Sequence, residues 1–524
     1  MKLKFNGKEV EAREGATILE AARANGVLIP TLCHFPGLNE VGACRICVVE
    51  VKGAERLVAA CNTKAAEGME IETASKRVLD ARKANLRLIL SEHDGKCPTC
   101  PRNGNCALQT LAANMGIMDE VAVTTPIVRN DAKCVKCMRC IEVCEKIQGQ
   151  GVWALLGSGK HARVGVADGA RLEESKCVYC GQCVTHCPVG ALSEADEVDK
   201  LLAAIHDPAK TVVLQVAPAV RAAWGEGIGL PAKAATEKRM AAVFRRLGVD
   251  YVFDTNFSAD LTIMEEGNEL LKRLAEPAFK RPMFTSCCPG WVRFLEKEYP
   301  ELLPQLSTAK SPQQMFGAIA KSYFAEKIGK DRKDVFCVSV MPCTAKKHEC
   351  KMDDTVDLVL TTREVDRLIR RLNLNVFMIP EEDFDSPLGT GSGAAVIFGR
   401  TGGVMEAALR TVATVKGVDL SGVRTKVVSG LNNARALIED IKAGRAEYDF
   451  VEVMACPGGC AGGGGQPIVE GCEMAEDRGA ALNAIDGKNP LHCSHENPEV
   501  ITLYKEFLGE PLSEKSHELL HVHR

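Results

Sequence analysis

The spacing of apolar and polar residues at the start of the chain predicts a β-hairpin followed by a helix. In MKLKFNGKEVEA, apolar residues lie on either side of an Asn-Gly pair, a sequence that favours a tight turn between two strands. The next stretch, TILEAARANG (17–26), has the apolar spacing of a helix. We therefore expect strand, strand and helix, in that order, before the first cysteines.

A different pattern begins near residue 206, where buried-strand runs alternate with helical stretches. TVVLQVAPAV (211–220) is largely apolar, and ATEKRMAAVFRRLGVD (235–250) has helical periodicity with a glycine stop before YVFDTNF returns to a strand pattern. The alternation recurs at 334–342, 356–372 and 434–456. Repeated strand–helix units predict an α/β domain with mostly parallel strands, in which functional loops follow the strand ends.

Composition adds one unusual feature, a high cysteine count. The chain has 524 residues, of which 24 are cysteine, and its net charge of −4 gives no basic surface that would indicate nucleic-acid binding. No apolar run is long enough to span a membrane, and the N-terminus does not resemble a signal peptide. We expect a cytoplasmic protein whose thiols stay reduced, so that clustered cysteines bind metal rather than form disulfides.

The first cysteine group follows the predicted hairpin and helix. It consists of Cys33, Cys44, Cys47 and Cys61. Four thiolates with one close pair suit a 2Fe–2S cluster, although zinc also accepts four cysteines and the first gap is longer than in plant-type ferredoxins. The order of elements resembles a β-grasp ferredoxin, which implies a [2Fe-2S] domain over residues 1–77.

The second group, in HDGKCPTCPRNGNC, adds a histidine to three cysteines. His93 lies four residues before Cys97, and Cys100 and Cys106 follow. Three thiolates and one imidazole can hold zinc or a 4Fe–4S cluster. The stretch resembles the one-His, three-Cys segment shared by iron-only hydrogenases and a large peripheral subunit of respiratory complex I. That resemblance implies a [4Fe-4S] cluster within residues 78–120, whose neutral ligand should alter the potential.

Two further groups repeat the CxxCxxCxxxC spacing of bacterial two-cluster ferredoxins, in which the fourth cysteine of each run ligates the other cluster. The first predicted set is Cys134, Cys137, Cys140 and Cys187. The second is Cys177, Cys180, Cys183 and Cys144. We therefore expect a domain with two [4Fe-4S] clusters over residues 121–205, with a small insertion between the runs. Two zinc sites are a poorer account of this spacing.

Three later motifs place cysteines near the ends of predicted strands. They are TSCCPGW (285–291), MPCTAKKHE (341–349) and EVMACPGGCAGGGGQP (452–467). In this order they resemble the signature motifs of the iron-only ([FeFe]) hydrogenases, and the resemblance covers essentially the whole chain. It implies a two-lobed catalytic domain over residues 206–524 that holds the H-cluster, a [4Fe-4S] cubane bridged to a diiron unit with carbonyl, cyanide and dithiolate ligands.

The resemblance also implies roles for residues around this cofactor. The residues that match the cubane ligands are Cys288, Cys343, Cys456 and Cys460, the last of which also bridges to the diiron unit. Lys346 matches a lysine that donates to a cyanide. The other matches near the diiron unit are Ala217, Pro218, Met341, Met454 and Phe398. Without the resemblance, the two methionines and the phenylalanine would be interpreted as core residues. The glycines of CAGGGGQP should let the backbone approach the cluster without a Cβ collision.

Cys287, the neighbour of the ligand Cys288, is expected to remain a free thiol that faces the open iron site and transfers protons. Its reference pKa of about 8.5 allows transfer in both directions near neutral pH. The family's proton relay matches Cys287, Glu266, Ser307 and Glu269, with Arg273 placed to hold the outer carboxylate. Glutamates three residues apart share one helix face. Without the resemblance, solvation alone would explain that face.

Several features stay outside this assignment. The cysteines without an assigned role are Cys337, Cys350, Cys472 and Cys493. The stretches after Glu349 and at 417–435 are shorter than is usual in the family, and the second lacks a strand–turn–strand segment. Because the motif spacings survive, we interpret both differences as trimmed surface structure that could alter a partner surface.

These patterns together predict an enzyme that interconverts protons and H₂ and uses four accessory clusters to carry electrons. The chain has no GxGxxG after a strand, which argues against nicotinamide binding by the chain itself. Its layout resembles the catalytic subunit of NAD(P)-reducing hydrogenases, some of them electron-bifurcating, and this implies a flavin- or NAD(P)-binding partner subunit and cofactor maturases. A stand-alone enzyme would use ferredoxin instead. A sensor, an assembly protein or an electron-transfer subunit would lack the free thiol, the lysine or the late motifs.

Overall fold

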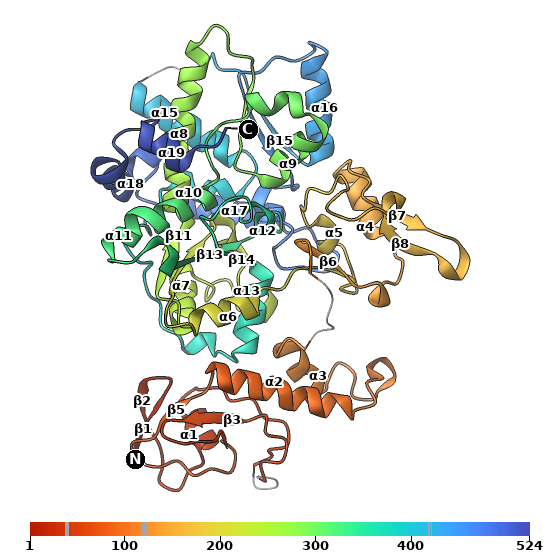
Figure 1. The fold of residues 1–524 in the computed structure, drawn as a ribbon, viewed down its shortest axis with the longest axis vertical. Coiled ribbons are helices and arrows are strands. Elements are labelled where there is room, and N and C mark those ends of the chain that lie inside the picture. The colour runs from red at the N-terminus through yellow and green to blue at the C-terminus, as the bar shows by residue number, and fades with distance from the viewer. Residues whose placement is uncertain (37–40, 118–122, 418–419, 421, 524) are drawn as a thin grey trace. The chain divides into compact units, whose positions relative to one another are not determined.

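The computed structural model describes residues 1–36, 41–117, 123–417, 420 and 422–523 (Figure 1). It forms two compact units, residues 1–120 with 366–380 and residues 121–365 with 381–524. The expected domain boundary between residues 120 and 121 lies outside the described residues, and so do three positions of the shortened 417–435 stretch.

The first unit contains a five-stranded sheet. In the order β2-β1-β5-β3-β4, its strands are Lys8–Glu11, Lys2–Phe5, Glu70–Glu72, Val48–Val51 and Val58–Ala59. The predicted hairpin is confirmed, with Asn6 and Gly7 at positive φ in the turn. The helix α1 (Ile18–Ala24) begins at Thr17, whose side chain accepts from the N–H of Glu20 while Glu20 accepts from the N–H of Thr17. The longer α2 (Lys76–Ser91) and α3 (Ala107–Asn114) follow.

The second unit begins with two short helices and two antiparallel strand pairs. The helices α4 (Arg139–Glu142) and α5 (Gln182–Thr185) each contain one cysteine of a CxxCxxCxxxC run, Cys140 and Cys183 respectively. The strands β6 (Ile127–Arg129) and β9 (Leu192–Glu194) pair with each other. The expected insertion between the two runs is a hairpin, β7 (Trp153–Leu156) and β8 (Arg163–Val166).

The rest of the second unit contains two parallel sheets, and the predicted α/β architecture is confirmed. The four-stranded sheet has the order β11 (Tyr251–Asp254), β10 (Thr211–Val216), β13 (Val335–Met341) and β14 (Leu358–Thr361). The three-stranded sheet has the order β12 (Met283–Phe284), β16 (Phe450–Met454) and β15 (Thr425–Ser429). Every residue of β10 is buried, as expected for a central parallel strand covered on both faces.

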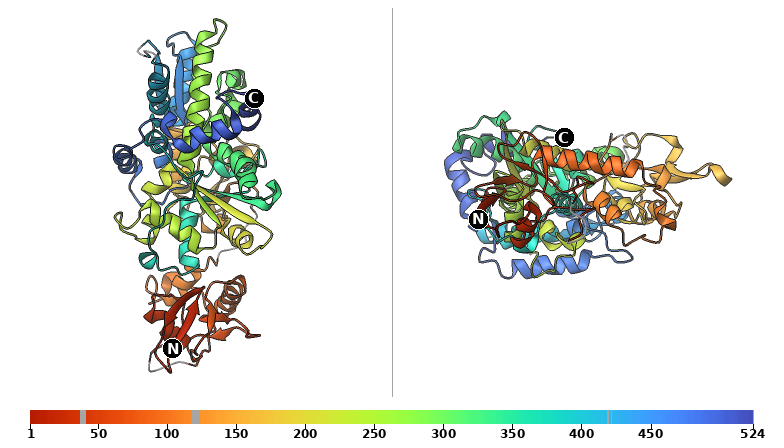
Figure 2. Two further views of the ribbon diagram at one scale, coloured as in Figure 1. Left: turned by 90° about the vertical axis from the view of Figure 1, so that its left-hand side faces the viewer. Right: turned by 90° about the horizontal axis from the view of Figure 1, so that it is seen from below.

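Helices cover these sheets (Figures 1 and 2). They are α6 (Val198–Ile205), α7 (Glu237–Arg246), α8 (Thr255–Ala275), α9 (Pro289–Glu298), α10 (Pro312–Ile319), α11 (Ala325–Lys327), α12 (Lys346–Glu349), α13 (Thr362–Arg371), α14 (Gly393–Val396), α15 (Gly403–Lys416), α16 (Leu431–Lys442), α17 (Ala475–Asp486), α18 (Pro498–Leu503) and α19 (Glu514–Leu520). The predicted helix at 235–250 is α7, with Gly248 at positive φ beyond its end. In the described part of the chain, no helix has the length and apolarity needed to cross a bilayer.

Candidate active site

A cavity with an empty volume of about 740 Å³ lies among the loops that follow β10, β12, β13 and β16. The two parallel sheets therefore contribute the carboxyl ends of their strands to one place, as expected for functional loops in α/β folds. The sequence-predicted residues that line this cavity are Ala217, Pro218, Cys287, Cys288, Met341, Cys343, Lys346, Phe398, Met454, Cys456 and Cys460. Residues far apart in the sequence thus meet around a single space.

The donor set of this cavity suits an iron–sulfur cofactor. Burial raises the pKa of Cys343 and of Cys456 to about 12, so these thiols would give up their protons only beside strong positive charge such as metal ions supply. The N–H of Ala455 points at the sulfur of Cys288 at 3.4 Å, a contact of the kind that tunes iron–sulfur clusters. The side-chain oxygen of Gln313, which also lines the cavity, is buried without a hydrogen-bond partner. These features fit a polar, metal-containing group.

The glycines of CAGGGGQP allow protein loops to approach one another closely. A Cβ on Gly463 would lie 2.2 Å from the carbonyl oxygen of Pro342, and one on Gly464 would lie 2.1 Å from that of Cys180. We expected these glycines to make room for a cluster. The structure gives them a further reason, since they let the loops that carry the cavity cysteines pack against each other.

Lys346 is held at the cavity by a buried carboxylate that the sequence reasoning overlooked. Its ammonium lies 2.8 Å from Glu349 Oε2 and donates to the carbonyl oxygen of Cys287 at 3.1 Å. Glu349 also accepts from Ser311 Oγ at 2.8 Å and from Gln313 Nε2 at 3.0 Å. Burial alone would lower the pKa of Lys346, but Glu349 outweighs it, so the pKa is raised and the charge is kept. The i,i+3 spacing within one short helix was the available signal.

Removing one member of this buried pair should destabilise the protein strongly. Lys346→Met leaves Glu349 buried without its cation, and we expect a loss of about 3–5 kcal/mol of stability. Lys346→Met with Glu349→Gln should recover part of that loss, because no isolated charge remains. Thermal unfolding of both variants tests this expectation, with Lys351→Met, an exposed neighbour, as the control. Equal melting temperatures for the single variant and the wild type would contradict it.

Cys287 and the predicted relay residues lie next to one another on buried elements. Burial, and then the nearby Glu266 and Cys288, raise the pKa of Cys287 well above its usual range. This differs from the expectation of a pKa near neutrality, so the resting side chain is a thiol. Glu266 is buried on α8 with neither carboxyl oxygen hydrogen-bonded, and burial followed by Glu269 raises its pKa to about 8. At neutral pH it is therefore a neutral acid that holds a proton.

The outer part of the predicted relay is hydrogen-bonded. Ser307 Oγ donates to Glu269 Oε2 at 2.7 Å, and Arg273 pairs with Glu269 Oε1 at 2.6 Å. Ser307 is buried on the loop after the short turn that ends at Gln305, and Arg273 lies one helical turn beyond Glu269 on α8. The structure therefore places Arg273 where the spacing suggested, against the outer carboxylate.

The two ferredoxin-type cysteine runs surround two smaller cavities in the crossed arrangement. A space of about 380 Å³ is lined by Cys134, Cys137, Cys140 and Cys187. Another, of about 320 Å³, is lined by Cys144, Cys177, Cys180 and Cys183. The active-site cavity is larger than either of these two. Among the described residues, no three His, Cys, Asp or Glu side chains converge on one single-ion position.

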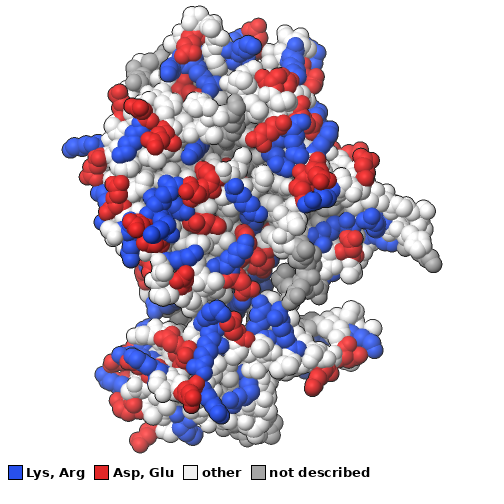
Figure 3. All heavy atoms as spheres, in the orientation of Figure 1, with Lys and Arg blue, Asp and Glu red and all other residues white. Residues whose placement is uncertain are grey.

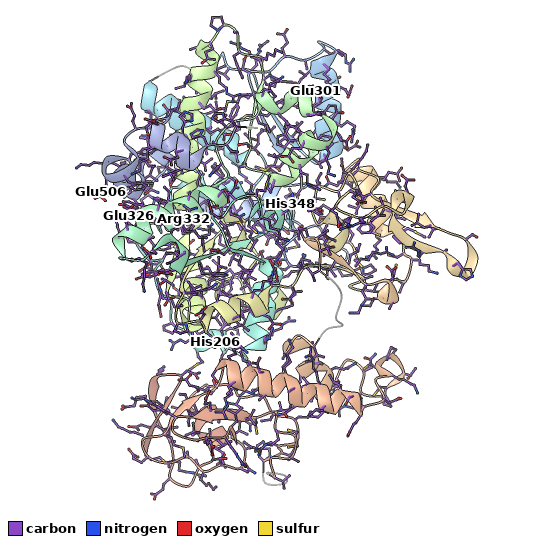
Figure 4. All side chains as sticks on the ribbon, viewed as in Figure 1. His206, Glu301, Glu326, Arg332, His348 and Glu506 are labelled. Atoms are coloured by element: carbon purple, nitrogen blue, oxygen red, sulfur yellow. The ribbon has the colours of Figure 1, made fainter. Side chains whose placement is uncertain are left out.

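The loop of the second cavity touches the active-site loops directly. The thiol of Cys456 lies 3.8 Å from the carbonyl oxygen of Cys180. Gln182 Nε2 donates to Gly462 O at 2.9 Å, which fixes the two loops together. Nearby lies His348, which is labelled in Figure 4. Its ring is 5.1 Å from that of Tyr179, and burial followed by Arg293 lowers the pKa of His348 to about 4. A neutral imidazole therefore packs at this junction.

The first unit contains the remaining predicted ligands. The four thiols of the first group lie near one another. Burial, and then the nearby Cys47, Cys33 and Cys44, raise the pKa of Cys61 to about 12. His93, Cys97, Cys100 and Cys106 all lie on the connection between α2 and α3, where His93 and Cys100 are exposed and the other two are half-buried.

The four unassigned cysteines lie in different surroundings. Cys337 is fully buried in β13, as expected for a small core residue, and Cys472 is exposed. Cys350 donates to the carbonyl oxygen of Lys347, and Cys493 is buried beside Thr414. On the face shown in Figure 3, basic and acidic side chains are intermixed rather than gathered into patches of one sign.

Comparison with known proteins agrees with this arrangement. Residues 210–464 match the iron only hydrogenase large subunit, C-terminal domain, and residues 472–523 match the iron hydrogenase small subunit. Residues 1–76 match a 2Fe-2S iron-sulfur cluster binding domain, and residues 133–191 match a 4Fe-4S dicluster domain. Residues 82–120 match the NADH-ubiquinone oxidoreductase-G iron-sulfur binding region.

Individual relatives cover nearly the whole chain. The NADP-reducing hydrogenase subunit HndD of Solidesulfovibrio fructosivorans is 45% identical over 99% of this chain and 98% of its own length. Iron hydrogenase 1 of Clostridium pasteurianum is 36% identical over the same shares. The solved [FeFe]-hydrogenase HydA(deltaEFG) is 43% identical with a TM-score of 0.56, over 63% of this chain and 98% of that one.

The fold and the site define an iron–sulfur oxidoreductase with an α/β catalytic domain of parallel sheets and ferredoxin-like domains before it. The chain belongs to the iron-only hydrogenases and is an enzyme of that family. The resemblance suggested by the three late motifs is therefore confirmed.

Proposed function

We propose that this chain catalyses 2H⁺ + 2e⁻ ⇌ H₂ as the catalytic subunit of an NAD(P)-coupled complex, with one [2Fe-2S] and three [4Fe-4S] clusters feeding the active site. The observation that supports the chemistry best is the convergence of Cys287 with four further cysteines and Lys346 on one cavity. A protein that only transferred electrons would have no need for a free thiol with a buried acid behind it.

The cysteines that would hold the cubane are Cys288, Cys343, Cys456 and Cys460, which all line the cavity. When bound, the H-cluster supplies the iron site at which electrons, protons and H₂ are exchanged. Lys346, kept charged by Glu349, provides an ammonium at the wall of the cavity, where it would face an anionic ligand. The apolar lining by Ala217, Pro218, Met341, Met454 and Phe398 would exclude water around the diiron unit.

The protons would move along side chains of this chain. The thiol of Cys287 gives its proton into the cavity, and its sulfur is reprotonated by the carboxylic acid of Glu266. Glu266 recovers a proton through the hydroxyl of Ser307, which is hydrogen-bonded to Glu269. Arg273 holds Glu269 at the outer end of the path. In H₂ oxidation the same groups carry protons in the opposite direction.

Electrons would enter through the accessory clusters. The predicted ligands of the two-cluster domain are those around the two smaller cavities, and the loop at Cys180 touches Cys456 of the active site. His93, Cys97, Cys100 and Cys106 would hold the third [4Fe-4S] cluster, and the first cysteine group the [2Fe-2S] cluster. We infer the NAD(P)-linked context from the similarity to HndD over the full length. A flavin-binding partner subunit would then exchange electrons with the first unit.

The test is to load the full chain with its clusters and diiron cofactor and to measure H₂ production from reduced viologen. We expect gas production together with infrared bands of bound CO and CN⁻. A fully loaded protein that shows these bands but produces no H₂ would contradict the enzymatic proposal. Co-purification with an FMN-binding subunit would support the NAD(P)-linked context, whereas monomeric elution and activity with ferredoxin alone would favour the stand-alone form.

A further inference from the structure

A second hydrogen-bonded path leads from Glu269 in a direction that the relay above does not use. Thr308 Oγ1 donates to Glu269 Oε1 at 3.0 Å, and the same hydroxyl lies 2.8 Å from Nδ1 of His521. On the other side of the ring, His521 Nε2 lies 3.0 Å from Glu265 Oε2. The side chains of His521 and Glu265 are both 0% exposed, so this is an internal ion-pair geometry rather than a surface one.

The fold holds these groups together through the backbone as well as the side chains. The segment after α19 pairs antiparallel with the loop that carries Ser307, since Lys310 N donates to Leu520 O and Val522 N donates to Thr308 O, both at 2.8 Å. Figures 1 and 2 show α19 crossing α8, the helix that supplies both Glu265 and Glu269. His521 is therefore held in a fixed position, with the Thr308 hydroxyl between its ring and Glu269 of the relay.

These contacts allow the ring of His521 to donate on both sides. When the Thr308 hydroxyl donates to the Glu269 carboxylate, the Thr308 oxygen can accept from Nδ1–H of His521. Glu265 also accepts from Tyr504 OH and from the N–H of Leu512, so Nε2–H of His521 donates to it. In this arrangement the ring of His521 bridges two carboxylates, one directly at Glu265 and the other at Glu269 through Thr308.

We propose that His521 is a positioning residue that stores a proton for the relay and passes it to Glu269 through Thr308. This inference rests on the proposed Cys287-to-Glu269 relay. In the transfer, the Nδ1–H bond of His521 breaks as the Thr308 oxygen gains that proton, and the original O–H bond of Thr308 breaks as Glu269 gains the other. The products are a neutral imidazole and a neutral Glu269, and no oxidant or other reactant is needed.

A route to solvent lies behind His521. The ring of His517 on α19 is 4.3 Å from that of His521, and the exposed His523 lies 6.2 Å beyond His517. The charged and titratable groups that face this cluster are Glu265, Glu269, Lys272 and Arg273 from α8, Tyr504 from the segment after α18, and the three histidines. Burial, and then His521, lower the pKa of His517, so His517 is mainly neutral near pH 7 and able to accept or return a proton.

The decisive variant is Thr308→Val, which removes the hydroxyl but keeps the side-chain shape, the backbone N–H to Glu269 and the backbone bonds of residue 308. With the fully loaded chain, we expect H₂ production to fall by about tenfold at pH 8 and much less at pH 6. At pH 8 free protons are scarce, so the stored proton matters most, and the alkaline limb of the pH–rate profile moves to lower pH. Thr308→Ser should restore most of the rate.

Controls separate a proton role from a structural one. His521→Gln keeps a donor toward Glu265 and should give the same pH shift as Thr308→Val. The infrared bands of the cofactor and the melting temperature of Thr308→Val should match the wild type. A Thr308→Val profile that overlays the wild type, or a Thr308→Ser profile as impaired as that of Thr308→Val, would overturn the proposal. Ser307→Ala distinguishes the relay from Cys287 to Glu269 from the additional path through His521. If Ser307→Ala loses activity while Thr308→Val has a normal pH–rate profile, the relay is supported and only the path through His521 is refuted.

Discussion

Replacing Cys287 with alanine should lower H₂ turnover by about a hundredfold or more while the clusters stay bound. The Cys287 thiol lies at the cavity wall, next to the buried acid Glu266. Its raised pKa keeps the thiol protonated until the proton is transferred into the cavity. Alanine removes that group without removing a predicted ligand. Iron content and the CO and CN⁻ infrared bands should therefore be close to those of the wild type, and Cys287→Ser should retain little of the rate, because a hydroxyl is a far weaker acid than a thiol.

The matched control is Cys337→Ala, which removes another buried thiol from the same domain. Cys337 lies within β13 and lines no part of the cavity described here, so this variant should retain turnover and lose some stability. Wild-type turnover in a fully loaded Cys287→Ala variant would refute the proposal that the Cys287 thiol transfers protons. A variant that instead loses its iron would show that Cys287 has a ligand role, which would equally refute it.

The grouping of the ferredoxin-type cysteines was predictable because its signal is local. Spacings such as CxxCxxCxxxC place several thiolates within one loop and one short helix, and the structure brings Cys187 to the first run and Cys144 to the second, as the ferredoxin pattern suggests. The α/β alternation was equally clear, since β10 is buried throughout and β13 is buried at every position except Phe336. The meeting of the late motifs followed from parallel topology, which places strand carboxyl ends at the same edge.

The supporting groups were not predictable for a physical reason. Thr308 and His521 are 213 residues apart, and neither lies in one of the three late cysteine motifs, so it is the pairing of the segment after α19 with the Ser307 loop that brings them together. The thiol pKa of Cys287 was also misjudged, because a reference value describes a solvated group and this one is buried next to Glu266. Burial and long-range pairing are properties of the fold, and the local sequence does not contain them.

Glu266 is a residue proposed to serve function that lowers the stability of the folded chain. Its carboxyl group is buried and has no hydrogen-bond partner, so the folded chain holds it neutral at a pKa of about 8. In the unfolded chain the same group would ionise at a pKa of about 4.3. Between these values the unfolded state binds fewer protons than the folded state, so the stability of the protein falls as pH rises from about 4 to about 8 and then levels off. The same carboxyl group that is ready to donate a proton therefore destabilises the folded chain as pH rises.

Glu266→Gln should consequently abolish most turnover and yet make the protein relatively more stable as pH rises. The amide cannot carry the proton between Ser307 and Cys287, so we expect a loss of about a hundredfold or more. Because glutamine does not ionise, the variant escapes a penalty that in the wild type grows by roughly 4 kcal/mol between pH 4 and pH 8. Melting temperatures of variant and wild type at pH 5 and pH 8 measure this, and the difference should move in favour of the variant at pH 8.

Glu197→Gln provides the opposite case within the same chain. Burial acts to raise the pKa of Glu197, but Lys347 and Lys200 outweigh it and the pKa is lowered. The ionised Glu197 therefore stabilises the folded chain fully at any pH above the pKa that this carboxyl group has in the unfolded chain. Glu197→Gln removes this contribution and should lower the melting temperature by a similar amount at pH 5 and at pH 8. If Glu266→Gln instead showed the same pH-independent change, or kept its turnover, Glu266 could not be the neutral buried acid behind Cys287, and the inner step of the relay would have to pass through another group.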